Sequence, residues 1–307
     1  MFVEPKSWFV IINPTSGNGS SKKNWPKIKF LLEKHQFDFK FAFTSYSGHS
    51  INLVHDAINQ NIKNFICIGG DGTLHNMVNS IMSQNNIPTY KINIGIIPIG
   101  TGNDWVKTHN IPKDFESAIN IIKNGVIATQ DIGKIVIQNS TKPPVFFNNL
   151  AGIGFDGFVV SNVEKHKRIG AISYLYGTII SLLSFKNFES KVTLKSESIS
   201  GKTLMILIGI CKYSGGGMQL TDKPDPFDGL LDITIAQDLS KFEIIKNLPK
   251  LFNGTITKYK KVKTFKTELV AIQLNQKKAP YIQADGELIG KGNIEVSILK
   301  NAISFYC

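Results

Sequence analysis

Arginine is almost missing from this 307-residue chain, although the chain is strongly basic. The formal net charge is +12, and Arg168 is the only arginine among 35 basic residues. Guanine readout and bidentate phosphate contacts mostly use arginine, so this composition disfavours a sequence-specific nucleic-acid-binding protein. A lysine-rich surface suits contact with an anionic membrane, or it reflects only a lysine-rich proteome, and both interpretations stay open.

Cysteines and long apolar segments are also scarce. Cys67, Cys211 and Cys307 lie far apart in the sequence and form no C-x-x-C pair, which favours reduced thiols in a cytoplasmic protein. The first residues lack the basic and apolar regions of a signal peptide. No run of about 18 apolar residues occurs, so the sequence predicts no membrane-spanning helix. The length of the chain suits two globular domains.

The pattern of predicted elements changes near residue 128. Up to that point apolar strands alternate with amphipathic helices, which predicts a parallel sheet covered by helices. From residue 129 onward strand-like segments follow one another, and only residues 158–186 interrupt them with a helical stretch. We therefore expect an N-terminal parallel-sheet α/β domain over residues 1–128 and a C-terminal antiparallel β-sandwich domain over residues 129–291.

One example of each element shows the basis of these assignments. The helix that begins near Lys22 carries Trp25, Ile28, Leu31 and Leu32 on one face, at helical spacing. Residues 37–43 instead alternate phenylalanine with other residues, which is the period of a strand.

Three strand-to-loop junctions in the first domain are rich in small residues. The central junction follows the apolar run 65–68 and precedes a helical pattern. A buried strand, a glycine turn and a helix N-terminus together present backbone N–H groups to a phosphate. Because the carboxyl ends of parallel strands share one sheet edge, three such loops can surround one nucleotide. The loops are Asn13-Pro14-Thr15-Ser16-Gly17, Gly69-Gly70-Asp71-Gly72-Thr73 and Gly100-Thr101-Gly102-Asn103-Asp104.

Two of these loops contain a carboxylate, which a phosphate alone would repel. The familiar G-x-x-x-x-G-K-[ST] and G-x-G-x-x-G fingerprints are both missing from the expected positions. At 4 Å in a surface-like dielectric, the repulsion is roughly 4 kcal/mol for each pair of charges. A divalent cation reverses its sign. We therefore predict that Asp71, assisted by Asp104, binds a Mg²⁺ ion that the nucleotide phosphates hold.

These ordered motifs resemble the diacylglycerol kinase catalytic-domain superfamily, which includes sphingosine kinases and bacterial lipid kinases. The resemblance rests on the three loops and continues in the family's order through residues 148–159, 213–233 and 284–290, so it covers nearly the whole chain. It implies a two-domain fold with the active site in the cleft between the domains. It also implies that the last strand, about residues 292–307, returns to the first domain.

The resemblance implies roles for a set of residues in the first domain and in the 285–287 segment. Glu287 becomes the general base with Asp285 nearby, and Asp71 and Asp104 complete the catalytic set, although Asp-Gly at 285–286 is equally a hairpin signal. The expected ATP contacts are Asn13, Ser16, Gly17, Thr44, Gly69, Gly70, Asp71, Gly72, Thr73, Leu74, His75, Gly100, Thr101, Gly102 and Asn103.

A structural magnesium site is implied in the second domain. Its ligands would be the Asp228 side chain and the backbone carbonyls of Asp225 and Leu230, and the alternative is an ordinary Asp-Gly turn.

The chain departs from the family where a basic residue often follows the first Ser-Gly. Asn18 and Gly19 stand at that point. Neutralisation of the phosphates then falls to Lys22 and Lys23 or to Lys165 and Lys167, and the sequence does not decide between the two pairs.

The sequence thus predicts an ATP-dependent, Mg²⁺-using lipid kinase of phospholipid metabolism, acting on a diacylglycerol-like or sphingoid lipid. An NAD kinase-like enzyme and a non-catalytic nucleotide- or lipid-binding regulator are the alternatives. We expect a cytoplasmic protein that binds no nucleic acid and attaches peripherally to anionic membranes. The acceptor lipid and the oligomeric state, including a homodimer, stay open. For the apolar stretch 169–185 we favour a core helix over a lipid-facing surface. The best candidate for electrostatic membrane contact is a lysine cluster formed by Lys258, Lys260, Lys261, Lys263 and Lys266.

Overall fold

Two units can be distinguished in the computed structural model, which describes residues 6–46, 48–165, 184–274 and 279–307. Unit 1 comprises the residues up to Ile132 together with Lys300–Cys307, and unit 2 comprises Gly133–Leu299. Strands β5 (Ile127–Ile137) and β15 (Ile294–Tyr306) contribute residues to both units.

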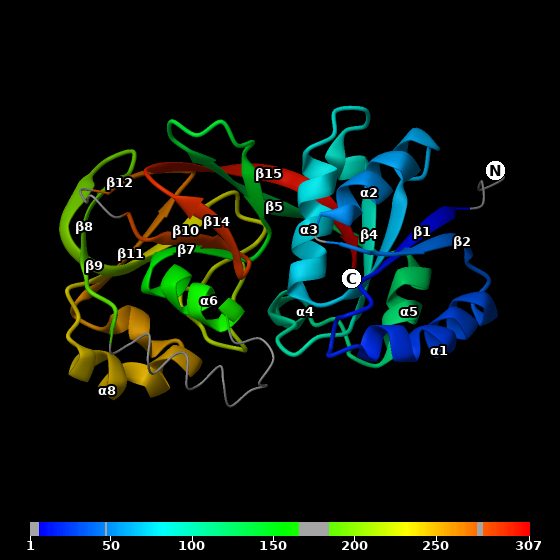
Figure 1. Cartoon of the computed structure of the whole chain (residues 1–307), viewed down its shortest axis with the longest axis horizontal. Coiled ribbons are helices and arrows are strands. Elements are labelled where there is room, and N and C mark those ends of the chain that lie inside the picture. Colours follow the sequence, from blue (N-terminus) through cyan, green and yellow to red (C-terminus); the bar gives the residue numbers. More distant parts are fainter. Residues whose placement is uncertain (1–5, 47, 166–183, 275–278) are drawn as a thin grey trace. The chain divides into compact units, whose positions relative to one another are not determined.

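Unit 1 is a parallel sheet with a pair of helices on each face (Figure 1). The strand order is β15-β4-β3-β1-β2, and each neighbouring pair is parallel. Helices α1 and α5 share one hydrophobic cluster with the sheet, and α2 packs against α3. The elements are β1 (Ser7–Ile12), α1 (Ser20–Lys34), β2 (Asp38–Phe43), α2 (His49–Asn59), β3 (Asn64–Gly69), α3 (Asp71–Met82), a 3₁₀ turn (Thr89–Lys91), β4 (Asn93–Pro98), α4 (Asp104–Thr108) and α5 (Phe115–Asn124).

The sequence pattern explains how α1 and β2 pack. The apolar face predicted for α1 is confirmed, because its four apolar side chains are all buried. Residues 38–43 form a strand as predicted, but β2 is the outer strand with only one neighbour, so none of its side chains is fully buried and burial does not alternate along it. Trp25 of α1 covers this strand, with its ring centroid 4.8 Å from that of Phe41.

Unit 2 consists mainly of antiparallel strands. Their order is β14-β13-β7-β9-β8-β12-β15, while β10 pairs with β9 and β11, and β6 pairs with β5. The fold class is therefore as predicted, a parallel-sheet α/β unit and an antiparallel β-sandwich unit. The remaining elements are β6 (Val145–Phe147), β7 (Leu150–Gly154), α6 (Phe155–Lys165), β8 (Phe188–Thr193), β9 (Ser198–Gly209), β10 (Leu231–Gln237), α8 (Lys241–Phe252), a 3₁₀ turn (Thr255–Lys258), β11 (Val262–Thr267), β12 (Leu269–Leu274), β13 (Tyr281–Ala284) and β14 (Glu287–Lys291).

Helix α8 corrects the expectation that only residues 158–186 interrupt the strands. The helix begins after Ser240, whose side chain accepts the Glu243 N–H, while the Glu243 carboxylate accepts the Ser240 N–H. This capping box satisfies two backbone groups at the start of a helix and has the sequence signature S-x-x-E. Pro249 inside the helix interrupts the helical pattern of the sequence.

The membrane-related predictions are only partly covered by the structure. Within the described ranges, no helix is long and apolar enough to cross a bilayer. The apolar stretch 169–185 lies outside the described residues, apart from Ser184 and Phe185.

Candidate active site

The three glycine-containing loops lie together at the carboxyl edge of the unit 1 sheet. Asn13 Nδ2 donates to Thr73 Oγ1 at 3.2 Å, and Ser16 Oγ lies 3.3 Å from the same hydroxyl. The Ile99 N–H donates to the Gly69 carbonyl at 2.8 Å. These contacts connect loop 13–17 to loop 69–73, and loop 69–73 to the chain that leads into loop 100–104.

Close packing requires glycine at two positions of these loops. A Cβ on Gly69 would lie 2.3 Å from Thr73 Oγ1. A Cβ on Gly100 would lie 2.9 Å from Gly70 Cα and 2.6 Å from Asn103 Oδ1. The Asn103 side chain is buried, and its Nδ2 donates to the Gly100 carbonyl at 3.1 Å. The small residues therefore let the loops pack backbone against backbone, as a phosphate cradle requires.

The Asp71 carboxylate connects the start of α3 to the start of α4. Oδ2 accepts the Asp104 N–H at 3.1 Å, and Oδ1 accepts the Trp105 N–H at 3.2 Å. Both donors belong to the first turn of α4, where N–H groups have no partner within the helix. A Cβ on Gly102 would lie 3.2 Å from Asp71 Oδ2 and 3.7 Å from Asp104 Oδ2, so the two carboxylates flank Gly102. The structure thus brings them together and gives Asp71 a structural task that the sequence did not indicate.

The remaining residues predicted to contact ATP or to neutralise its phosphates differ in position and in burial. The Thr44 N–H donates to the Ile12 carbonyl at 2.9 Å, which places Thr44 next to the end of β1. Leu74 and His75 are buried within α3. Lys22 and Lys23 are exposed in the first turn of α1. Lys167 lies outside the described residues.

The β13–β14 hairpin of unit 2 turns at Asp285, whose carboxylate receives three backbone N–H groups. Oδ1 accepts from Asn149 at 2.9 Å and Leu150 at 3.1 Å, and Oδ2 accepts from Asn148 at 3.0 Å. Asp285 also donates its own N–H to the Leu150 carbonyl at 2.9 Å. The residue therefore fastens the hairpin to the start of β7, in addition to forming the predicted Asp-Gly turn.

Glu287, two residues later, is placed differently. Its side chain is half-buried at the first position of β14. The backbone of Glu287 pairs with Ala284 of β13, but the Glu287 carboxylate takes part in no hydrogen bond or ion pair with any described residue. Of the two hairpin carboxylates, Glu287 is the one whose oxygens are not committed to the fold, which is what a general base requires.

A half-buried carboxylate close to this hairpin was missed by the sequence reasoning. Asp156 lies in the first turn of α6. Its Oδ2 accepts a hydrogen bond from Gln283 Nε2, while Gln283 Oε1 accepts the Gly286 N–H at 2.8 Å. Burial raises the pKa of Asp156 to about 6. The Gly-Phe-Asp-Gly sequence at 154–157 was a visible signal. In the structure, Gly152 leaves room for this carboxylate, because a Cβ there would clash with Asp156 Oδ2.

The predicted magnesium ligands of unit 2 lie on one turn before β10. Asp228 Oδ1 accepts the Leu230 N–H at 2.9 Å, and Asp228 Oδ2 accepts from Lys266 Nζ at 2.7 Å. The Asp225 carbonyl accepts the Asp228 N–H at 3.4 Å. Carboxylate and carbonyl oxygens are ligands that suit Mg²⁺, so the donors fit the ion in kind, with the Lys266 ammonium as a competing positive charge. In the part of the chain that the structure describes, no group of three or more His, Cys, Asp or Glu side chains could hold a metal.

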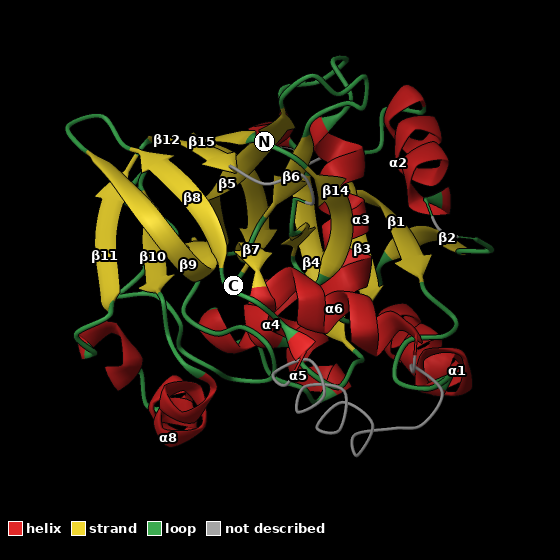
Figure 2. Cartoon of the chain, turned by 60° about the vertical axis from the view of Figure 1, so that its left-hand side comes forward, coloured by secondary structure: helices red, strands yellow, loops and turns green. Residues whose placement is uncertain are grey.

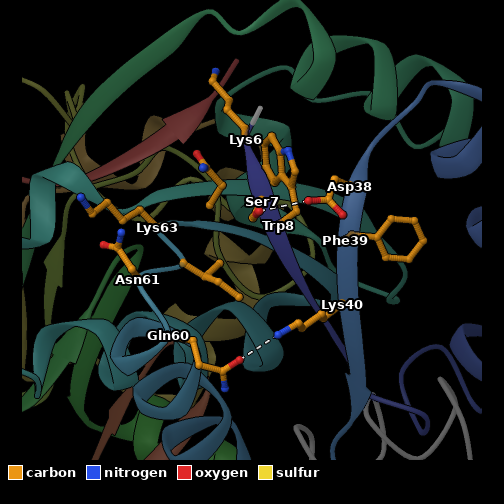
Figure 3. Close-up of a pocket in the computed structure, with 11 residues that line it drawn as sticks. Lys6, Ser7, Trp8, Asp38, Phe39, Lys40, Gln60, Asn61 and Lys63 are labelled. Atoms are coloured by element: carbon orange, nitrogen blue, oxygen red, sulfur yellow. Dashed lines mark hydrogen bonds between the residues drawn. The ribbon is translucent and has the colours of Figure 1, made fainter. Parts of the chain in front are cut away.

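A surface pocket of unit 1 lies away from the predicted site. It has a volume of about 440 Å³ and opens at the amino ends of β1, β2 and β3, the sheet edge opposite to the glycine loops (Figure 3). Lys6, Lys40 and Lys63 stand around it, and Lys40 donates to Gln60 Oε1 at 2.9 Å. All three lysines are exposed, so this pocket is a shallow surface feature and contains no predicted site residue.

Comparison with known protein families identifies both parts of the chain. Residues 7–135 match the diacylglycerol kinase catalytic domain, and residues 149–307 match the YegS C-terminal NAD kinase beta sandwich-like domain. The chain therefore belongs to the diacylglycerol kinase catalytic-domain superfamily, in the bacterial branch that carries a YegS-type second domain. The family predicted from the motifs is confirmed.

Similar proteins match this chain over most of their length. A diacylglycerol kinase of Staphylococcus saprophyticus is 29% identical over 283 residues, which are 92% of this chain and 89% of the relative. A diacylglycerol kinase of Mycobacterium tuberculosis is 25% identical over 95% of this chain and 92% of its own. A diacylglycerol kinase structure from Bacillus anthracis has a TM-score of 0.72 at 20% identity, covering 99% of this chain and 98% of that one. At that identity, the structural likeness concerns the fold.

Proposed function

We propose that this protein is an ATP-dependent lipid kinase that transfers the γ-phosphoryl group to a hydroxyl of a diacylglycerol-like or sphingoid lipid. The observation that carries the proposal is the hydrogen-bonded set of three glycine-containing loops at the carboxyl edge of the unit 1 sheet. Backbone N–H groups at this edge of an α/β sheet suit the phosphates of a nucleotide. The relatives named diacylglycerol kinases support the lipid acceptor.

In this proposal, different residues of the chain bind ATP, accept the proton and position the base. Loops 13–17, 69–73 and 100–104 hold the ATP phosphates. Glu287 takes the proton of the acceptor hydroxyl while the hydroxyl oxygen forms a bond to the γ-phosphorus. The bond between the γ-phosphorus and the β–γ bridging oxygen breaks, and that oxygen leaves with ADP. Asp285 positions Glu287 by fixing the hairpin to β7.

We further propose two roles for Mg²⁺. At the nucleotide, Asp71 and Asp104 would hold it, and the bound ion would neutralise charge on the phosphoryl oxygens. At the turn before β10, the Asp228 side chain and the carbonyls of Asp225 and Leu230 would hold a structural ion.

The proposed protein works on the cytoplasmic side, where ATP is supplied, at the surface of an anionic membrane. The predicted lysine cluster supports this only in part. Lys258, Lys260 and Lys263 are exposed. Lys266 is exposed as well, but it forms an ion pair with Asp228 at 2.7 Å, and the half-buried Lys261 forms one with Glu243 at 2.8 Å.

Incubation with γ-labelled ATP, Mg²⁺ and a panel of lipids plus NAD tests the function. We expect label in a phosphorylated lipid. Label found only in NADP would replace the proposal by an NAD kinase-like function, and unlabelled products with intact ATP binding would indicate a non-catalytic regulator.

A further inference from the structure

The outward face of α8 is apolar, whereas a surface helix usually turns its polar face to water. Phe242, Ile245, Leu248 and Phe252 have exposed fractions of 73, 52, 41 and 58%. At 3.6 residues per turn, these side chains fall within about one third of the helix circumference. Singly scattered apolar side chains need no explanation, but a strip of four on a 12-residue helix marks an interaction surface.

The opposite face fixes α8 to unit 2. Ile244 and Leu251 pack against the hydrophobic clusters of the β-sandwich. Asn247 is buried, and its Nδ2 donates to the Glu243 carbonyl at 2.7 Å. At the C-terminal end, the Gln219 N–H donates to the Leu251 carbonyl at 2.7 Å. With the capping box at its start, the helix is anchored at both ends, and Figure 2 shows it at the margin of unit 2.

Positive charge accompanies the apolar strip. Lysines outnumber acidic residues on α8 by three to one, and the single acid, Glu243, is held by Lys261 and by the Tyr259 hydroxyl, both at 2.8 Å. Lys241 and Lys246 are exposed on the helix, and Lys258 is exposed shortly after it. An apolar strip bordered by lysines complements an anionic bilayer, in which acyl chains lie beneath negative headgroups.

We propose that α8 docks unit 2 onto an anionic lipid bilayer, lying in the plane of the interface. Phe242, Ile245, Leu248 and Phe252 enter the boundary between headgroups and acyl chains, and the lysines contact the headgroups. A second copy of the chain would also cover the strip, but a symmetric contact would bring the lysines of two α8 helices together, and like charges oppose such a contact. The choice of a bilayer rests on the proposed lipid-kinase function, because the acceptor is itself a bilayer component.

Vesicle sedimentation of the full chain tests the proposal, with phosphatidylglycerol–phosphatidylcholine vesicles and with phosphatidylcholine alone. The double variant Phe242→Ser/Phe252→Ser should bind the anionic vesicles at least tenfold more weakly than the unmodified chain. Phe30→Ser is the matched control, since Phe30 on α1 is 63% exposed and lies in unit 1. Both variants should keep the melting temperature of the unmodified chain.

A fluorescence measurement locates the contact. The three tryptophans of the chain, Trp8, Trp25 and Trp105, are buried in unit 1, so the added tryptophan of Phe252→Trp reports on α8. Its emission should shift to shorter wavelength on anionic vesicles and be quenched by brominated acyl chains. Unchanged vesicle binding of the double variant, or emission that brominated lipids do not quench, would overturn the proposal. A concentration-dependent dimer that the double variant abolishes, without vesicle binding, would assign the strip to a second copy instead.

These measurements use neither ATP nor turnover, so their failure concerns α8 alone. Failure of the lipid-kinase function would appear separately, as absence of phosphate transfer to a lipid presented in detergent micelles.

Discussion

At the scale of single residues, the β13–β14 hairpin uses two neighbouring acids in different ways. The Asp285 carboxylate accepts three backbone N–H groups, whereas Glu287 makes no such contact with the described residues. The Asp-Gly-Glu sequence indicates a hairpin and two candidate acids. It could not separate their roles, because the partners of Asp285 lie about 135 residues earlier in the chain.

Asp285→Asn should therefore act first on stability. The amide NH₂ cannot accept the N–H that Oδ2 now accepts, and a buried donor without a partner costs about 1–3 kcal/mol. We expect a melting temperature lower by several degrees, measured by calorimetry. Asp56→Asn, at an exposed position of α2, is the control and should leave the melting temperature unchanged. An unaltered melting temperature for Asp285→Asn would remove its structural role.

Asp156 should make stability depend on pH. Burial raises its pKa from 3.8 to about 6, so between these values the folded state binds more protons than the unfolded state. The contribution of Asp156 to the free energy of unfolding is therefore fully present below pH 3.8 and is lost as the pH rises through about 6. Asp156→Asn removes this loss, so the variant should gain stability relative to the unmodified chain between pH 4 and pH 7. Denaturant unfolding of both proteins at pH 4 and pH 7 measures this gain. The same difference in the free energy of unfolding at both pH values would contradict the account.

At the scale of elements, three short loops meet at one edge of the unit 1 sheet, and one carboxylate joins two helices. The sequence indicated the three loops because each follows an apolar strand, and the shared edge followed from parallel pairing. It did not indicate that Asp71 caps α4, since that contact depends on how the third and fourth strands lie side by side. It also missed α8, whose capping-box signature competes with an internal proline.

Asp71→Asn tests the two tasks of Asp71 separately. Loss of one accepted N–H from the first turn of α4 should cost about 1 kcal/mol, as removal of an N-cap does. If Asp71 also holds the nucleotide's Mg²⁺, the variant should lose the gain in ATP affinity that Mg²⁺ confers. Calorimetric titration with ATP, with and without Mg²⁺, measures this. The same loss of affinity under both conditions would leave Asp71 with its structural task alone.

The turn before β10 can be tested through heat stability in the absence of nucleotide. Mg²⁺ should raise the melting temperature of the unmodified chain, and Asp228→Asn should abolish the shift. Lys266→Gln should enlarge the shift, because the competing ammonium 2.7 Å from Asp228 Oδ2 is removed. If Mg²⁺ changes the melting temperature of none of the three proteins, a structural ion at this turn is excluded.

At the scale of the whole molecule, the order of motifs predicted the family and the succession of an α/β unit and a β-sandwich unit. The period of the apolar residues and the positions of the glycines are local signals, so they can be detected in a single sequence. The hydrogen bonds of the site carboxylates are not local signals. Those from Asn148 to Asp285 and from Gln283 to Asp156 join distant segments.

The central claim is that loops of unit 1 hold ATP while Glu287 of unit 2 takes the acceptor's proton. Single-turnover transfer from γ-labelled ATP to lipid, measured for the unmodified chain and for Glu287→Gln together with ATP affinity, tests it most directly. Positioned acid–base catalysis contributes about 10²- to 10⁴-fold, so the rate should fall within that range while ATP affinity stays the same. A fall of less than about tenfold in the folded variant would contradict the account.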